Sequence, residues 1–239
     1  MNPCGQARVA ASAAATNPRS ASGGADLLLL AGALLLANLP LLTGASVEPL
    51  VFRPDRVAAG EWWRALSFPF VHVSLYHLAL DAGAFLILLH SLRGIGAGSR
   101  IRIAAGAAAG SLAAAFLDPA LAARGLCGLS GPAHGLMAAS ALDMLRNGPD
   151  RTVRRTGWAA LIVVAAKSVV EAVTGSVFLA ELHFGNVGAP VALCHLGGVI
   201  GGAAAWAAAR KSQRPCQCAA RPSPSNLESP SGRPPPQGR

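Results

Sequence analysis

A serine and a histidine, each lying among glycines at one end of an apolar stretch, are the residues of this chain best suited to catalysis. Ser130 lies in residues 128–131, Gly-Leu-Ser-Gly, and His195 lies in residues 194–198, Cys-His-Leu-Gly-Gly. A serine whose proton is removed by a neighbouring histidine becomes a nucleophile. A histidine within an apolar membrane segment is costly to bury and marks a functional site. Together the two residues predict hydrolysis through a serine nucleophile.

Each motif also has a purely structural interpretation. In a chain with 27 glycines, Gly-x-Ser-Gly can be an ordinary site of close helix packing. His195 can simply form a hydrogen bond with a neighbouring carbonyl. The nucleophile elbow of soluble hydrolases needs Gly-x-Ser-x-Gly after a strand, and here Pro132 takes the place of the second glycine. The chemistry therefore depends on a fold that brings the two motifs together.

The composition indicates a helical membrane protein. Of the 239 residues, 52% are hydrophobic and 13% are charged, and this charged fraction is about half the average of soluble domains. The apolar residues form long blocks, which favours several membrane-spanning helices. The net charge is +9, but the arginines lie between the apolar blocks, so membrane topology explains them better than nucleic-acid binding does.

The chain divides into a central domain and two tails. The composition predicts disordered cytoplasmic tails at residues 1–24 and at the Pro- and Ser-rich residues 211–239. Between them, residues 25–210 hold six apolar segments, at 25–42, 68–92, 100–117, 131–145, 157–174 and 190–209. The first segment can also be a cleaved signal peptide, because two arginines precede it and small residues follow it. We favour a retained span, since an even number of spans puts both tails on one side.

The distribution of arginines predicts the orientation of this all-α, six-helix bundle. With the N-terminus in the cytoplasm, the short cytoplasmic loops hold seven arginines and the outer loops hold four. Because Lys and Arg are enriched in the cytoplasmic loops of membrane proteins, we expect both termini inside.

This topology puts the serine and the histidine at similar depth. Ser130 begins the fourth segment at its outer end, and His195 lies about one and a half turns into the sixth from the same side. Glycines four residues apart let helices approach closely, and these two segments hold three such pairs: Gly131 and Gly135, Gly197 and Gly201, Gly198 and Gly202. We expect a Ser–His contact in a water-accessible outer cavity, where amides at the start of the fourth helix can stabilise an oxyanion.

Further polar groups lie within the apolar segments. His77 and Asp81 are four residues apart and share a helix face. His134 lies one turn below the serine and either orients the site or forms an interhelical hydrogen bond. Lys167 and Glu171 are one turn apart in the fifth segment, where isolated charges are costly, so we expect them to form an ion pair.

The chain resembles the rhomboid family of intramembrane serine proteases over residues 25–210. The resemblance rests on four motifs in the family's order: residues 61–64 (Glu-Trp-Trp-Arg), 72–81, 128–131 and 195–198. Within the family, residues 128–135, Gly-Leu-Ser-Gly-Pro-Ala-His-Gly, resemble the rhombosortase branch, in which a histidine follows the serine by four.

The resemblance implies a catalytic dyad without an acidic third member. Ser130 would be the nucleophile and His195 the general base, and later the acid. By the same resemblance, His77 and the Ser130 amide would line the oxyanion hole, with the residue at position 81. Four further residues would support the site: Gly128, Gly131, His134 and Gly198.

Asp81 departs from the family pattern, which has an asparagine at this position. An ionised carboxylate donates no hydrogen bond and would repel an oxyanion, whereas a protonated one could donate. Alternatively, Asp81 pairs with His77. The substitution therefore leaves a catalytically inactive, client-binding rhomboid open as an alternative.

The resemblance implies neither metal nor cofactor. His72, His77, His134 and His195 could in principle form a metal site, but their matches to the protease pattern argue against one. The family places the fifth helix beside the substrate gate, so Lys167 and Glu171 can also contact substrate. A small transporter built around that pair is a further alternative, but it leaves the Ser–His pair unexplained, and no internal repeat supports it.

The implied partners are the lipid bilayer and a single-span membrane protein substrate, and not a nucleic acid. A rhombosortase would cut substrates with a C-terminal Gly-Gly motif, a hydrophobic span and a basic tail. A general rhomboid protease would cut other membrane proteins. By this resemblance, the protein would lie in a bacterial inner membrane with its active site open to the outer, periplasmic face.

Overall fold

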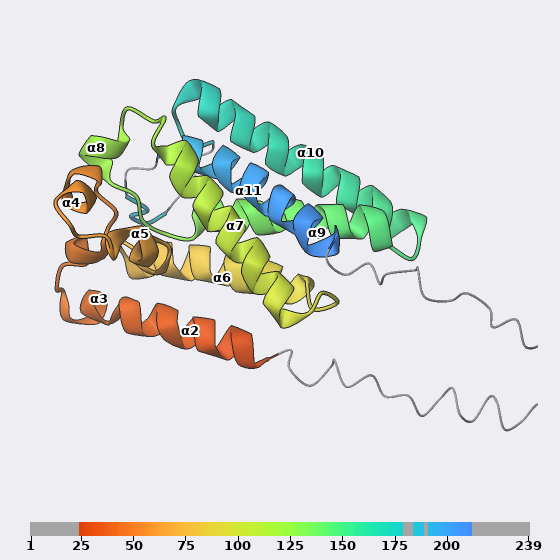
Figure 1. Cartoon of the computed structure of the whole chain (residues 1–239), viewed down its shortest axis with the longest axis horizontal. Coiled ribbons are helices and arrows are strands. Elements are labelled where there is room, and N and C mark those ends of the chain that lie inside the picture. The colour runs from red at the N-terminus through yellow and green to blue at the C-terminus, as the bar shows by residue number, and fades with distance from the viewer. Residues whose placement is uncertain (1–23, 179–183, 189–190, 212–239) are drawn as a thin grey trace, which may run out of the picture.

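Helices make up almost all of the secondary structure in the part of the chain that the structure describes (Figure 1). The computed structural model describes residues 24–178, 184–188 and 191–211. Within these residues the only strand-like contact is an isolated antiparallel bridge between Phe52 and Leu126. The expected all-α class is therefore confirmed for the described part of the chain. The tails expected at 1–24 and 211–239 lie outside it, except for residues 24 and 211.

One long helix lies in each of the six expected segments. These are α2 (Ala25–Ala37), α6 (Leu75–Ser91), α7 (Ala97–Ala115), α9 (Ser130–Asn147), α10 (Arg151–Thr174) and α11 (Leu193–Lys211). Short helices fill the connections: α3 (Leu39–Thr43), η2 (Glu48–Leu50), α4 (Pro54–Ala58), α5 (Arg64–Ser67), η3 (Phe68–Phe70) and α8 (Leu121–Arg124).

Among the described helices, α10 alone is both long and apolar enough to be a clear membrane span by itself. The apolar helix α2 has 13 residues, which is about 20 Å of helix against a hydrocarbon core of about 30 Å. A second candidate span combines α5 and η3 with α6, although these bend by 89°. In α7, α9 and α11, glycines and charged residues such as Arg100, Asp143 and Arg210 lower the mean hydropathy. Six spans with both termini inside therefore remain our proposal.

The segment expected at residues 68–92 is wrong at its start, because α6 begins seven residues later. Its first residues form η3, and the chain then bends before α6. Ser74 caps α6 by accepting a hydrogen bond from the His77 amide at 3.0 Å. The His72 amide donates to Asn38 Oδ1 at 2.9 Å. The backbone amides at the bend thus donate to side chains in place of helical carbonyls.

Glycines let α7, α9 and α11 touch through their backbones. A Cβ at Gly198 of α11 would lie 2.7 Å from the carbonyl carbon of Gly131 in α9. A Cβ at Gly110 of α7 would lie 2.9 Å from the Cα of Gly201 in α11. Larger residues do not fit at these contacts. The expected close approach of the fourth and sixth segments is confirmed, and α7 joins them.

Large apolar side chains cover much of the outside of the bundle. On α10, Trp158, Ile162 and Val173 are between 58% and 82% exposed. Such a surface suits contact with lipid better than contact with water. Figure 1 also shows that α2 begins and α11 ends at the same end of the bundle, which supports an orientation with both termini on one side.

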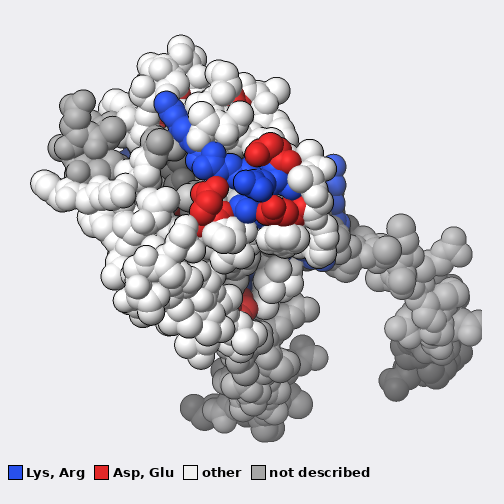
Figure 2. Space-filling view, turned by 90° about the vertical axis from the view of Figure 1, so that its left-hand side faces the viewer, with Lys and Arg blue, Asp and Glu red and all other residues white. Residues whose placement is uncertain are grey.

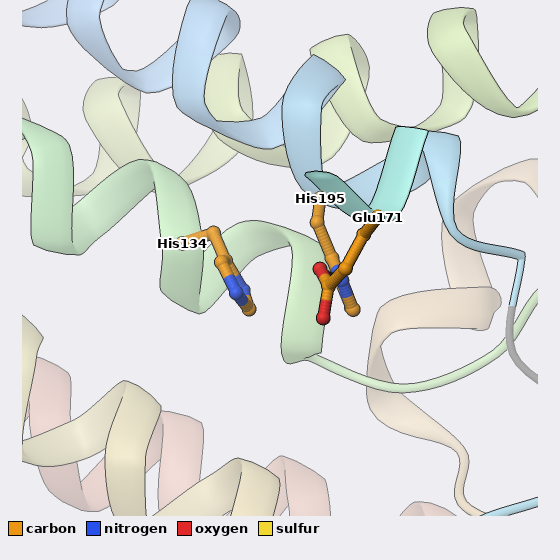
Figure 3. Close-up of side chains that lie close together, drawn as sticks. All are labelled: His134, Glu171 and His195. Atoms are coloured by element: carbon orange, nitrogen blue, oxygen red, sulfur yellow. Dashed lines mark hydrogen bonds and ion pairs between the residues drawn. The ribbon is translucent and has the colours of Figure 1, made fainter. Parts of the chain in front are cut away.

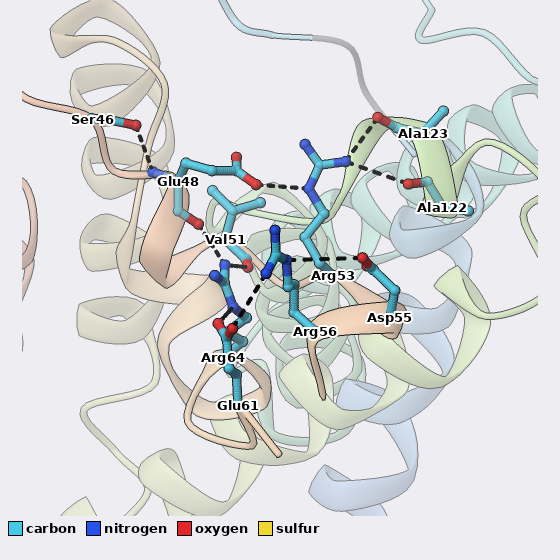
Figure 4. Close-up of polar contacts among 10 residues, drawn as sticks. All are labelled: Ser46, Glu48, Val51, Arg53, Asp55, Arg56, Glu61, Arg64, Ala122 and Ala123. Carbon is cyan, nitrogen blue, oxygen red and sulfur yellow. Dashed lines mark hydrogen bonds and ion pairs between the residues drawn. The ribbon is translucent and has the colours of Figure 1, made fainter. Parts of the chain in front are cut away.

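Charged side chains gather in a patch at the opposite end, within a largely uncharged surface (Figure 2). Ion pairs join Arg53 to Glu48 at 2.8 Å and Arg64 to Glu61 at 2.6 Å (Figure 4). The hydrogen bond to Glu48 raises the pKa of the Arg53 guanidinium above its usual value. Arg53 also donates to the carbonyl of Ala123 in α8 at 2.9 Å. The first loop is thereby fixed to the segment that leads into α9.

Polar contacts hold α2 at both of its ends. Near its start, Asp26 forms an ion pair with the buried Arg100 of α7 at 2.6 Å. At its end, the Asn38 amide group donates to the Phe70 carbonyl at 2.7 Å and accepts from the His72 amide. A cleaved signal peptide would make no such contacts in the mature protein, so they support a retained first segment.

Replacing Asn38 by alanine is expected to destabilise the fold by about 2–4 kcal/mol, because the buried His72 amide and the half-buried Phe70 carbonyl both lose their contact with its side chain. Thermal unfolding in detergent measures this. Thr43→Ala is the matched control, because its hydroxyl forms only an exposed bond to the Pro40 carbonyl. Equal unfolding temperatures for the two variants would contradict the role of Asn38.

Candidate active site

The candidate nucleophile and the candidate base are in contact. Ser130 is the first residue of α9, and His195 lies in the first turn of α11. The His195 Nε2 is 3.0 Å from the Ser130 Oγ, within the range of a general base and its hydroxyl. The histidine is closer to its helix start than expected, because α11 begins at Leu193 rather than at residue 190.

The loop before the serine is fixed from two sides. The Gly128 amide donates to the Phe68 carbonyl, and the Leu129 amide donates to Asp81 Oδ2, both at 2.9 Å. Gly128 has φ +97°, which disfavours any residue with a Cβ. A Cβ there would also lie 2.8 Å from Asp81 Oδ2 and 3.0 Å from the His77 ring. Gly128 thus lets α6 come close to the start of α9.

A buried carboxylate lies on the far side of the histidine, in contrast to the dyad that the resemblance implies. The Glu171 Oε2 is 2.6 Å from the His195 Nδ1, and Glu171 is fully buried. Glu171 lies near the end of α10, at the same end of the bundle as the first turn of α11. The expectation that no acidic residue attends the histidine is therefore wrong for this chain.

Two further residues join this group. The expected Lys167–Glu171 ion pair is confirmed, with Lys167 Nζ 2.6 Å from Glu171 Oε1. The same ammonium lies 3.0 Å from His134 Nε2, and His134 Nδ1 lies 2.7 Å from the Ser130 carbonyl. Figure 3 shows the two imidazoles close together, and they stack with centroids 4.2 Å apart and planes inclined by 11°. His134 thus forms both a local and an interhelical contact.

His134, Glu171 and His195 could also hold a metal ion, since one ligand atom from each lies within 4.8 Å of the others. The hydrogen bonds of these residues argue against metal binding. The Lys167 ammonium already supplies a positive charge between Glu171 and His134, and the Ser130 hydroxyl faces His195. A cation would have to displace the ammonium. The residues therefore suit a proton-transfer site better than a metal centre.

Asp81 faces hydrogen-bond donors. Its Oδ2 accepts from the Leu129 amide, lies 3.1 Å from His77 Nε2 and lies 3.7 Å from His72 Nε2. The other ring nitrogen of His77 accepts a long hydrogen bond from the Val73 amide at 3.4 Å. The pairing of Asp81 with His77 is thus the arrangement that the structure adopts, and it directs the His77 N–H toward the carboxylate.

A cavity of about 250 Å³ opens at this site. Its lining includes the polar residues His77, Asp81, Ser130, His134, Lys167 and His195. Apolar residues such as Val177 and Phe178 form part of its wall. Glu171 does not line it, so the expectation that Glu171 contacts substrate is not supported, whereas Lys167 is accessible from the cavity.

The Rhomboid domain family matches residues 59–212. This range is more than half of the chain and contains all the candidate site residues, whereas α2 lies before it. The comparison with curated proteins finds no match. The chain therefore belongs to the rhomboid family of intramembrane serine proteases and is an integral membrane protein.

Proposed function

We propose that this protein is an intramembrane serine endopeptidase in which Ser130 is the nucleophile and His195 the general base. The observation that carries the proposal is the 3.0 Å contact between His195 Nε2 and Ser130 Oγ at the wall of an open cavity. If the serine and the histidine served helix packing alone, we would not expect both of them to line the same cavity. Water can enter such a cavity, as hydrolysis within a membrane requires.

In the first half of the reaction, Ser130 Oγ attacks the scissile carbonyl carbon while its proton passes to His195 Nε2. The tetrahedral intermediate then collapses, the C–N bond breaks, and His195 gives the proton to the leaving amine. An acyl-enzyme remains on Ser130. In the second half, His195 takes a proton from water as the water oxygen attacks the ester carbon. The acyl C–O bond then breaks, His195 returns the proton to Ser130 Oγ, and the new carboxyl terminus of the substrate is released.

The start of α9 supplies the charge that the oxyanion needs. Ser130 and Gly131 occupy the first two positions of the helix, where backbone amides have no intrahelical acceptor. The helix dipole also favours negative charge at this end. The Leu129 amide is occupied by Asp81. The Ser130 amide is thus the main donor in our mechanism, and each such donor is worth roughly 3–4 kcal/mol in soluble hydrolases.

The substrates in this proposal are single-span membrane proteins with a C-terminal Gly-Gly motif, a hydrophobic span and a basic tail. The support is the rhombosortase-like run at residues 128–135, with His134 four residues after the serine. Glycines weaken a helix and expose its carbonyls, so a Gly-Gly site suits a nucleophile that needs an unwound peptide. We place the cavity at the outer face of a bacterial inner membrane, in a six-span bundle with both termini inside.

The first test is labelling of the purified protein by a fluorescent fluorophosphonate, which forms a covalent bond with an activated serine and releases fluoride. We expect the wild type to be labelled and both Ser130→Ala and His195→Ala to show none. Ser140→Ala is the matched control, because Ser140 lies in the same helix but its hydroxyl faces Ser91 at 2.8 Å. A folded wild type without labelling would favour the inactive, client-binding alternative.

Substrate class is tested with two fusion proteins that differ only at the motif. One carries Gly-Gly before its hydrophobic span and basic tail, and the other carries Val-Val. Cleavage of the first alone, assayed by product mass, is the expected result. Equal cleavage of both would indicate a general rhomboid protease.

A further inference from the structure

We propose that Glu171 is a positioning residue that completes a Ser130–His195–Glu171 triad, held in place by Lys167 and His134. This inference rests on the proposed function, because it assigns roles in that same reaction. It goes beyond the serine and histidine pair that the family resemblance implies.

The contacts of the Glu171 carboxylate leave it no freedom to rotate. Its Oε1 accepts from Lys167 Nζ at 2.6 Å and from the Phe178 amide at 2.8 Å. Its Oε2 lies 2.6 Å from His195 Nδ1. A fully buried carboxylate needs such donors to remain ionised, and here Lys167, the Phe178 amide and His195 supply them. The oxygen aimed at His195 is therefore held in direction as well as in distance.

With both imidazole rings neutral, these hydrogen bonds define where the protons lie. An ammonium can only donate, so the His134 Nε2 that faces Lys167 must be an acceptor. His134 therefore carries its proton on Nδ1 and donates it to the Ser130 carbonyl. The carboxylate likewise requires the His195 proton on Nδ1. The His195 Nε2 is then left with a free lone pair that faces the serine hydroxyl, as a general base needs.

The same residues fit the charge that develops during the reaction. Before it, Lys167 neutralises the buried carboxylate. When His195 takes the serine proton, the new imidazolium lies against Glu171 Oε2. The neutral His134 ring, stacked at 4.2 Å, hinders rotation of the His195 ring away from the serine. Lys167 and His134 act through Glu171 and His195, and so are also positioning residues.

The test compares second-order fluorophosphonate labelling rates, per folded protein, for Glu171→Gln, Lys167→Met and the double variant. Soluble triads lose about 10⁴-fold when the carboxylate is replaced, so we expect a loss of about 10²–10⁴-fold for Glu171→Gln. Lys167→Met should lose on the order of tenfold, and the double variant no more than Glu171→Gln alone. Asp143→Asn is the matched control, since it removes a carboxylate from the ion pair with Arg210, thirteen residues along α9 from the serine, and should label as the wild type does.

Proton NMR of the Ser130→Ala protein supplies an independent readout. A strongly deshielded Nδ1 proton, absent after His195→Ala or Glu171→Gln, marks the His–carboxylate bond. If Glu171→Gln does not fold, the labelling rate of Lys167→Met tests the inference instead. Loss of a purely structural ion pair would lower the unfolding temperature without slowing the labelling of folded protein. Labelling of folded Glu171→Gln within threefold of the wild type overturns this inference alone. A wild type without labelling overturns the proposed function instead.

Discussion

Replacing Gly198 by valine is expected to abolish fluorophosphonate labelling, and replacing it by alanine to slow labelling by about 10²-fold or more. The Cβ of alanine would lie 2.7 Å from the Gly131 carbonyl carbon and 2.9 Å from Ser111 Oγ. Gly131 follows the serine directly, and Gly198 lies three residues after the histidine. Any separation of α9 from α11 here lengthens the contact between nucleophile and base, and displacements of about 1 Å can cost 10²-fold in rate.

The measurement pairs labelling rate with thermal unfolding, because overpacking costs about 1–3 kcal/mol of stability as well. Gly83→Ala is the matched control, since Gly83 lies in α6 with nothing within 4 Å of the new Cβ. It should label normally and unfold at the same temperature or slightly above, because alanine favours helix. Wild-type labelling by folded Gly198→Ala would show that the contact between α9 and α11 tolerates movement.

The sequence was sufficient to predict this contact. The glycine pairs, and the position of each motif at the start of an apolar segment, can be recognised without knowing the fold. They led to a serine–histidine contact at one end of a helical bundle, and the structure has one. Ion pairing of Lys167 with Glu171 was predictable for the same reason, since residues four apart share a helix face.

The contact of Glu171 with His195 was not predicted. Both residues lie near the segment ends that the predicted topology puts at the same membrane face, and this was the available signal. However, depth does not determine which face of a helix points inward, and the apolar residues of α10 are spread over all its sides. The rotation of α10 is fixed by its packing against α9, where a Cβ at Gly157 would lie 3.0 Å from the Ala141 carbonyl oxygen. Such a contact is a property of the assembled bundle.

The bend before α6 was missed for a different reason. Apolar residues predominate from residue 68 to residue 92, and this block suggested one helix. The break is made by hydrogen bonds, with Ser74 capping α6 and Asn38 of a distant segment binding the His72 amide. The bend matters for the site, because α6 carries His77 and Asp81 to the loop before the serine.

The remaining question about the site is the charge of Asp81, and its contacts make that question testable. Oδ2 already accepts from the Leu129 amide and faces His77 Nε2, whereas Oδ1 has no hydrogen bond among the described residues. The residue also lines the cavity. An asparagine can keep its oxygen at the place of Oδ2 and put its amide group at the place of Oδ1. It would then keep both contacts, remove a negative charge and add a donor beside the oxyanion.

Asp81→Asn is therefore expected to raise the labelling rate, by about tenfold and at most by the 10²–10³-fold that one oxyanion donor contributes in soluble hydrolases. Asp81→Ala should lower it, because the Leu129 amide loses its acceptor and the loop before Ser130 is no longer fixed. The two variants remove the same charge, so their opposite signs separate the effect of the charge from that of the hydrogen bond. If both variants slow labelling equally, the negative charge itself serves the reaction, and the His77–Asp81 pair acts as a unit.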